Sequence, residues 1–349
     1  MSSFALLGAV AALLTAWSLF RRRRLGAASK GSVGSPSRPG LSDLGLNPLG
    51  RSLAACNAIV LAVGTILFFA GPGLTIDWST TWLAALMLAA LFVGWLNFYL
   101  VPGPPREWFV AESLLLTFLM LLLTNVLVPM QYGALALGMP YADSWLAASD
   151  ARLGVHVPTL AAWTRAHPLI SSIVTFTYVT FGPQLLLTVL LLVVLRERER
   201  LWEFAFHFHF CLTLTIAALA LWPSICPVPY YGFTPTIDYS RALTQISGFH
   251  DRSMTLIRFD ELDGLVSFPS FHVIGAMLVT WAFRHRRRVL IPLTVLNTGL
   301  AISTVISGIH YAVDVLGAVP LVGGSLVAYR WWGQRRLIAE EVVQESKAA

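Results

Sequence analysis

The chain has 349 residues, of which 56% are hydrophobic and 12% are charged, and its mean hydropathy is +0.69. Soluble proteins carry about 25% charged residues, so this composition excludes an ordinary soluble domain and indicates a chain buried largely in lipid. The net charge is +6, and 22 of the 24 basic residues are arginines. The three cysteines lack the spacing of a disulfide framework or a zinc site.

Nine apolar runs are long enough to cross about 30 Å of hydrocarbon as α-helices. Membrane strands would need alternating polar residues, which runs such as LLLTVLLLVVL lack. The predicted fold class is therefore all-α, a polytopic membrane helix bundle with about nine transmembrane helices. In chain order the runs cover residues 3–20, 53–71, 81–101, 109–130, 169–195, 204–223, 268–283, 289–307 and 313–329.

The first run is followed by four arginines at 21–24, whereas a secretory signal carries its positive charge before the apolar region. We therefore expect an uncleaved helix, and a misassigned start codon is the alternative. Residues 25–51 are rich in Gly, Ser and Pro and predict a disordered linker without chemistry. Residues 1–52 form an N-terminal extension, 53–336 a membrane domain and 337–349 a cytoplasmic tail in this prediction.

Basic residues accumulate in short loops on the cytoplasmic side of a membrane. If the C-terminus is cytoplasmic and the nine predicted helices cross the membrane in alternating directions, 19 of the 24 basic residues lie on the cytoplasmic side. The N-terminus is then outside. Two longer loops, at 131–168 and 224–267, face outward and hold the five remaining basic residues, which are Arg152, Arg165, Arg241, Arg252 and Arg258.

The first outward loop carries apolar residues at roughly helical intervals, which predicts amphipathic helices lying on the membrane surface. These residues include Trp145, Leu146, Leu160 and Trp163. We favour a lid over the helix ends without a chemical role, and we assign no catalytic role to the two histidines of this loop.

The second outward loop ends in Ser267-Phe268-Pro269-Ser270-Phe271-His272, where the seventh predicted helix begins. Pro269 suits the first turn of a helix and Ser267 is a candidate cap. His272 then lies within about one turn of a helix N-terminus, where free N–H groups and the helix dipole favour an anion. Ser270 adds a hydroxyl group, so this segment suits a phosphate.

A second histidine, His310, stands at the outer end of the eighth predicted helix, four residues before Asp314. On a continuous helix the two side chains share a face, so the carboxylate can reach one imidazole nitrogen. That contact would fix the tautomer and leave the other nitrogen free to attack. His272 and His310 are separated by two membrane crossings and return to the same face. The alternative is a packing role, but ionisable residues within membranes are costly and favour function.

These motifs resemble the type 2 phosphatidic acid phosphatase superfamily, whose signature is PSGH followed by SRx5HxxxD. The chain has Pro269-Ser270-Phe271-His272 and then Ser303-Thr304, five residues, His310, three residues and Asp314. The resemblance covers roughly residues 80–330. It implies a six-helix phosphatase-like core with additional N-terminal helices, and it places the motif-bearing part at 169–330. FPSFH, with HYxxDVxG following, is similar to the branch that includes inositol phosphorylceramide synthases.

The resemblance also implies a role for each motif residue. His310 would be the nucleophile that forms a phosphohistidine, Asp314 its orienting partner, and His272 the general acid that protonates the leaving alcohol. Ser270 would hold a phosphate oxygen. The histidine with a carboxylate partner is also the better nucleophile on chemical grounds. Such a route needs no metal, and we expect no cofactor.

Two positions depart from the family pattern. Thr304 stands where the arginine is expected, and no KxxxxxxRP block occurs upstream. A phosphoryl transition state needs positive charge nearby. We predict that Arg252 and Arg258, with Arg241 third, replace the missing groups. The alternative is surface charge paired with Asp251 or Asp260.

The predicted function is that of a lipid-phosphate phosphatase or a lipid head-group phosphotransferase, acting on a lipid phosphate or phospholipid at the outer leaflet of the plasma (inner) membrane. The alternative from another class is a membrane transporter or lipid-binding protein with a histidine proton relay. That alternative would call for charged residues at the midplane and repeated broken helices, which the sequence lacks. No nucleic-acid partner is expected, because membrane topology explains the arginine runs.

Overall fold

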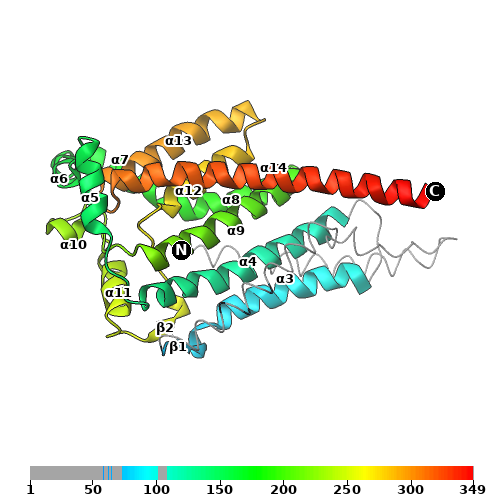
Figure 1. The fold of residues 1–349 in the computed structure, drawn as a ribbon, viewed down its shortest axis with the longest axis horizontal. Coiled ribbons are helices and arrows are strands. Elements are labelled where there is room, and N and C mark those ends of the chain that lie inside the picture. Colours follow the sequence, from blue (N-terminus) through cyan, green and yellow to red (C-terminus); the bar gives the residue numbers. More distant parts are fainter. Residues whose placement is uncertain (1–57, 59–61, 63, 65–72, 101–107, 349) are drawn as a thin grey trace. The chain divides into compact units, whose positions relative to one another are not determined.

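The computed structural model describes residues 58, 62, 64, 73–100 and 108–348 (Figure 1). The predicted spans at 3–20 and, almost entirely, at 53–71 lie outside the described residues, as does the predicted linker at 25–51. Twelve α-helices are described. They are α3 (Trp82–Leu100), α4 (Trp108–Leu135), α5 (Asp143–Arg152), α6 (Val157–Ala166), α7 (Pro168–Val179), α8 (Phe181–Val194), α9 (Arg198–Leu221), α10 (Pro227–Tyr231), α11 (Ser240–His250), α12 (Phe271–Ala282), α13 (Arg287–Ile306) and α14 (Ala312–Ala348).

Five of these helices, α3, α4, α9, α13 and α14, are long and apolar enough to cross a membrane. The predicted span at 169–195 is divided into α7 and α8, and this bent pair is a sixth candidate if it is taken as one span. The predicted span at 268–283 corresponds to α12, whose 12 residues are about 18 Å long. The predicted class, an all-α membrane helix bundle, is confirmed.

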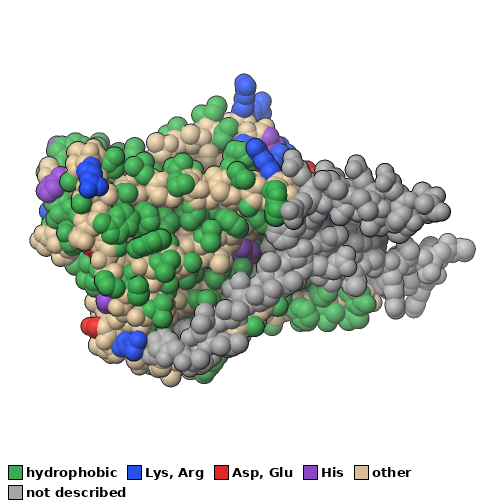
Figure 2. Space-filling model, viewed as in Figure 1, with side chains coloured by type: hydrophobic (Ala, Val, Ile, Leu, Met, Phe, Trp, Pro, Cys, Tyr) green, Lys and Arg blue, Asp and Glu red, His purple; other side chains and the backbone are tan. Residues whose placement is uncertain are grey.

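Exposed side chains on these helices are largely apolar. Figure 2 shows hydrophobic side chains over much of the visible surface. On α14 the exposed residues include Leu316, Val319 and Val327, and on α13 they include Ile291 and Val295. Such helices suit a lipid environment, because their exposed apolar side chains contact lipid tails and their backbone hydrogen bonds are made within the helix.

The chain forms two compact units. Unit 1 comprises residues up to 139, 182–202 and 240–265, and unit 2 comprises 140–181, 203–239 and 266–349. In unit 1, α3 and α4 lie side by side (Figure 1) and α11 packs against α4. Unit 1 also holds the two described strands, β1 (Thr75–Asp77) and β2 (Leu256–Arg258), which pair in parallel with Ile76 opposite Ile257.

Unit 2 contains both histidine motifs. Within it α12 packs against α13 and α14, α13 against α6 and α7, and α14 against α5. The amphipathic helices predicted for the first outward loop are α5 and α6. The unit therefore brings the ends of several helices together around the segments at 267–272 and 303–314.

The predicted start of the seventh helix is wrong. We expected Ser267 to cap it and Pro269 to lie in its first turn, but α12 begins at Phe271 and its N-cap residue is Ser270. The Ser267 hydroxyl has a stronger acceptor elsewhere, the carboxylate of Asp314 at 2.7 Å. His272 is still in the first turn of the helix, as predicted.

Candidate active site

His310 lies in the short connection between α13 and α14, outside both helices. The chain leaves α13 through Gly308, whose φ of +93° is in the left-handed region that favours glycine. A Cβ atom at Gly308 would also lie 2.6 Å from a ring carbon of Phe233. The His310 amide then donates to the Thr304 carbonyl at 3.0 Å. Glycine and this backbone hydrogen bond together turn His310 back over the end of α13.

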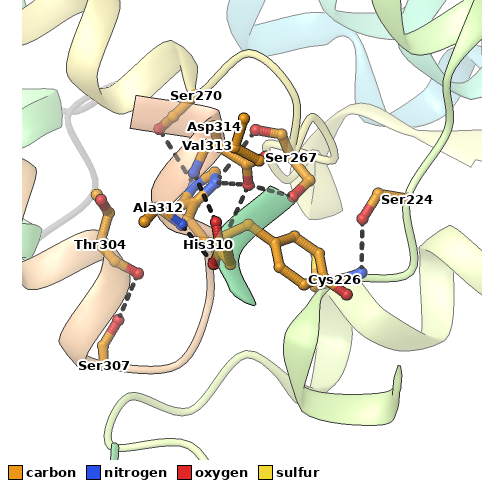
Figure 3. Close-up of polar contacts among 12 residues, drawn as sticks. Ser224, Cys226, Ser267, Ser270, Thr304, Ser307, His310, Ala312, Val313 and Asp314 are labelled. Atoms are coloured by element: carbon orange, nitrogen blue, oxygen red, sulfur yellow. Dashed lines mark hydrogen bonds and ion pairs between the residues drawn. The ribbon is translucent and has the colours of Figure 1, made fainter. Parts of the chain in front are cut away.

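His310 contacts Asp314, as the four-residue spacing predicts, but by a different route. The imidazole Nδ1 is 3.2 Å from Asp314 Oδ2, and both side chains are buried (Figure 3). The prediction assumed a continuous helix, whereas α14 begins only at Ala312. Asp314 Oδ2 also accepts from the Ser267 hydroxyl at 2.7 Å and from the Tyr311 amide at 3.0 Å. The Asp314 carboxylate therefore orients the imidazole of His310 and also holds the backbone of the connection between α13 and α14.

The surroundings of His310 favour one tautomer. Its Nδ1 faces two acceptors, Asp314 Oδ2 and the Ser267 carbonyl oxygen, each at 3.2 Å. Neither acceptor has a proton to give while Asp314 is ionised, so Nδ1 carries the hydrogen and Nε2 keeps its lone pair. Nε2 is 3.3 Å from the Ser270 hydroxyl oxygen. The unprotonated nitrogen thus faces the start of α12.

The start of α12 brings Ser270 and His272 close to the imidazole of His310. The Ser270 amide donates to the Asp314 carbonyl oxygen at 3.1 Å, which joins α12 to α14. The ring centroids of His272 and His310 are 5.9 Å apart. His272 stacks on Tyr178 at 4.5 Å and is partly exposed. Four predicted residues, Ser270, His272, His310 and Asp314, therefore meet within unit 2.

Two buried carboxylates of α5, neither of them predicted from the sequence, also reach this connection. Asp143 accepts from the Tyr311 hydroxyl at 2.9 Å, and Asp150 accepts from the amides of Ala312 and Val313. Burial raises the pKa of both carboxyl groups, and these hydrogen bonds oppose the shift. A signal was present, because two aspartates seven residues apart share the apolar face of a predicted helix.

Thr304, at the position where the family has an arginine, supplies no charge. Its side chain is buried and its hydroxyl donates to the Ala301 carbonyl at 2.8 Å. Its carbonyl accepts from the His310 amide and from the Ser307 hydroxyl. Thr304 therefore supports the backbone of the connection.

The three arginines predicted to replace the missing charge all belong to unit 1 and have partners there. Arg241 makes two hydrogen bonds to Asp263, and Arg252 donates to the Ala136 carbonyl at 3.0 Å. Arg258 pairs with Asp77, Asp260 and Glu261. The pairing with Asp260 is the one that the surface-charge alternative names. Their role in binding phosphate stays a prediction.

The two other arginines of the outward loops, Arg152 and Arg165, belong to unit 2 with His310. Both are exposed, and the side chain of neither forms an ion pair or a hydrogen bond with another described residue. Arg165 lies one helical turn after Ala161, whose Cβ would be 3.3 Å from a Cβ built at Gly308. The sequence pattern had predicted no role for these two arginines.

A model of the PAP2 superfamily matches residues 144–328, which include both histidine motifs. The chain belongs to this superfamily, whose members are generally phosphatases or phosphotransferases, and its long apolar helices indicate a membrane protein. Neither the curated proteins nor the solved structures include a match to the chain.

Proposed function

We propose that the chain is an integral membrane lipid-phosphate phosphatase or lipid head-group phosphotransferase that works through a phosphohistidine at His310. One observation carries the proposal. The Nδ1 atom of His310 is held by Asp314 and by the Ser267 carbonyl, so the lone pair of Nε2 faces the Ser270 hydroxyl, with the His272 ring 5.9 Å from the His310 ring. An imidazole oriented in this way is a prepared nucleophile.

In the first step Nε2 of His310 attacks phosphorus. An N–P bond forms, and the P–O bond to the lipid alcohol breaks. His272, in its imidazolium form, gives its proton to the leaving oxygen, and the anionic phosphate beside it favours that form. Asp314 stabilises the positive charge that develops on His310.

In the second step the hydroxyl of an acceptor attacks the phosphohistidine. His272, now neutral, takes the proton of the attacking hydroxyl, the N–P bond breaks, and His310 returns to its first state. Water as the acceptor gives a phosphatase. A lipid or polyol hydroxyl gives a transferase. The FPSFH and HYxxDVxG segments, which are similar to the inositol phosphorylceramide synthase branch, support that second acceptor.

The start of α12 supports binding of the transferred phosphate. The first intrahelical hydrogen bond from this turn runs from the Ile274 amide to the Ser270 carbonyl. The amides before Ile274 have no partner within the helix, and with the helix dipole they attract an anion. The Ser270 hydroxyl lies at the same place and would hold a phosphate oxygen.

The distribution of arginines supports an orientation with the C-terminus in the cytoplasm. The site would then face the outer leaflet of the plasma (inner) membrane. The division into an N-terminal extension at 1–52, a membrane domain at 53–336 and a cytoplasmic tail at 337–349 is part of the same proposal.

The experiment is a turnover assay on the purified full chain in mixed micelles, with a panel of lipid phosphates and phosphatidylinositol. We expect wild type to turn over at least one lipid and His310→Ala to turn over none. The matched control is His156→Ala, because its imidazole hydrogen-bonds to Thr159 and packs edge-on against Tyr231, away from the four motif residues. Release of inorganic phosphate identifies a phosphatase, and head-group exchange without release identifies a transferase. Equal turnover by wild type and His310→Ala would overturn the proposal.

A further inference from the structure

Helix α5 turns one face toward the interior of unit 2. Positions i, i+3, i+4 and i+7 of this helix are buried, whereas residues between them, such as Ser144 and Ala148, are exposed. Two of the four buried positions are aspartates, which are rarely buried without a partner. The buried positions are Asp143, Leu146, Ala147 and Asp150.

Asp150 binds the start of α14 with both of its carboxylate oxygens. Oδ2 accepts from the Ala312 amide and Oδ1 from the Val313 amide, each at 2.9 Å. These are the first two residues of α14, whose amides have no partner within the helix. A carboxylate at this end also interacts favourably with the helix dipole. Asp150 thus acts as a cap supplied by another helix, and it fixes where α14 begins.

Asp143 binds the residue directly after His310. Its Oδ1 accepts from the hydroxyls of Tyr311 and Ser224, each at 2.9 Å, and its Oδ2 accepts from the Ile225 amide at 2.9 Å. Tyr311 is fully buried, so its hydroxyl needs this acceptor. Asp143 therefore ties His310's neighbour to α5 and to the segment after α9.

The residues of α5 that lie between the two aspartates on its buried face make apolar contacts with the same segments. Leu146 and Ala147 form one buried cluster with Tyr311, and Phe268 and Val313 pack against it. Phe268 belongs to the segment that supplies Ser270 and His272. The same face of α5 therefore touches both segments that build the candidate site.

We propose that Asp143 and Asp150 are positioning residues, and that α5 sets where Nε2 of His310 stands relative to Ser270 and His272. This inference rests on the proposed function. It revises the expectation that the first outward loop is a lid without a chemical role. Three consecutive residues after His310 are held by α5, so loosening the helix moves the imidazole without removing any reacting group.

Displacement of a nucleophile by about 1 Å lowers turnover much more than it lowers substrate binding. Asp150→Asn keeps one oxygen acceptor and Asp150→Ala keeps none, so the two variants form a graded pair. We expect kcat to fall about tenfold in Asp150→Asn and about a hundredfold in Asp150→Ala, with KM changed less than about threefold. Asp143→Asn is expected to resemble Asp150→Asn.

The matched control is Ala148→Asn, which places the same side chain on the exposed face of α5. Its kcat per folded molecule is expected to stay within about twofold of wild type, because the hydrogen bonds to Tyr311 and α14 remain. If Asp150→Ala fails to fold, the two asparagine variants carry the test. A kcat unchanged in both asparagine variants would overturn the proposal, whatever their melting temperatures.

A second measurement separates this inference from the proposed function. Diethyl pyrocarbonate modifies exposed imidazoles, and His310 is buried in the folded chain. We expect mass spectrometry of the full chain to show His310 modified about tenfold faster in Asp150→Asn than in wild type or Ala148→Asn, since a displaced imidazole loses its cover. A wild type without turnover but with this pattern would contradict the proposed function and support the role of α5 in holding His310. Equal modification in all variants would contradict that role.

Discussion

The Oδ2 atom of Asp314 lies 3.2 Å from Nδ1 of His310 and 2.7 Å from the hydroxyl oxygen of Ser267. One carboxylate oxygen thus joins the two segments that carry the histidines. Because a carboxylate only accepts hydrogen bonds, this arrangement orients the His310 ring and fixes its tautomer at the same time.

Replacing Asp314 with asparagine keeps the shape of the side chain but brings an amide that also donates. The His310 ring can then adopt the other tautomer, with hydrogen on Nε2, which cannot attack. We expect kcat for the lipid substrate to fall by about 10²- to 10⁴-fold, as when the orienting carboxylate of a catalytic histidine is lost elsewhere. Steady-state kinetics on Asp314→Asn measure this. A loss smaller than about fivefold would argue against an orienting role.

Ser267→Ala and Ser270→Ala should differ in kind. Ser267→Ala removes a buried donor to Asp314, and we expect the free energy of unfolding to fall by about 1–3 kcal/mol together with activity. Ser270→Ala removes a hydroxyl 3.3 Å from Nε2, too long for a strong hydrogen bond, so we expect a smaller loss of stability but a clear loss of turnover. Thermal melting in detergent and turnover of the same samples test the contrast. A reversed pattern would contradict the assignment of the two serines.

Gly308→Ala should destabilise the connection that carries His310. Its φ of +93° and the 2.6 Å approach to the Phe233 ring both oppose a Cβ atom. We expect a loss of about 1–3 kcal/mol in stability. Gly323→Ala in α14 is the control, because nothing lies within 4 Å of a Cβ there. Equal melting temperatures for the two variants would show that the turn tolerates a side chain.

Two sets of arginines can be compared for binding of the phosphate. Arg252→Gln with Arg258→Gln tests the arginines that the sequence singles out, and Arg152→Gln with Arg165→Gln tests those in the unit that holds His310. Loss of an arginine that stabilises the transferred phosphate should lower kcat/KM by about a hundredfold or more. We expect that loss in one of the two pairs, and in the other pair only a small change, as is usual for surface charge. Unchanged kcat/KM in both pairs would exclude all four arginines from the site.

Convergence of the histidines was predictable because it depends only on counting membrane crossings. The contact between His310 and Asp314 was also predictable from spacing, although a turn and not a helix brings them together. By contrast, the sequence treats 169–195 as one apolar span, and hydrophobicity alone does not reveal the break at Thr180. Pro183, close after it, was the available signal.

The contributions of Ser267 and α5 were not predictable in the same way. Asp143 and Tyr311 are 168 residues apart, and Ser267 and Asp314 are 47 apart. The spacing of Asp143 and Asp150 marks a shared helix face but not the partners of that face, which depend on how the helices pack in three dimensions. The Ser267 prediction failed because a capping pattern competes with a buried carboxylate that only the fold brings near.

The most direct test of the account is detection of the phosphorylated histidine. The purified chain would be mixed with the lipid substrate found in the panel, quenched in alkali within milliseconds to seconds, digested and mapped by mass spectrometry. The account predicts phosphate on His310 in wild type, its accumulation when the acceptor is omitted, and its absence in His310→Ala. A wild type that turns over substrate with no phosphate on His310 at any quench time, or with phosphate on another residue, would contradict it.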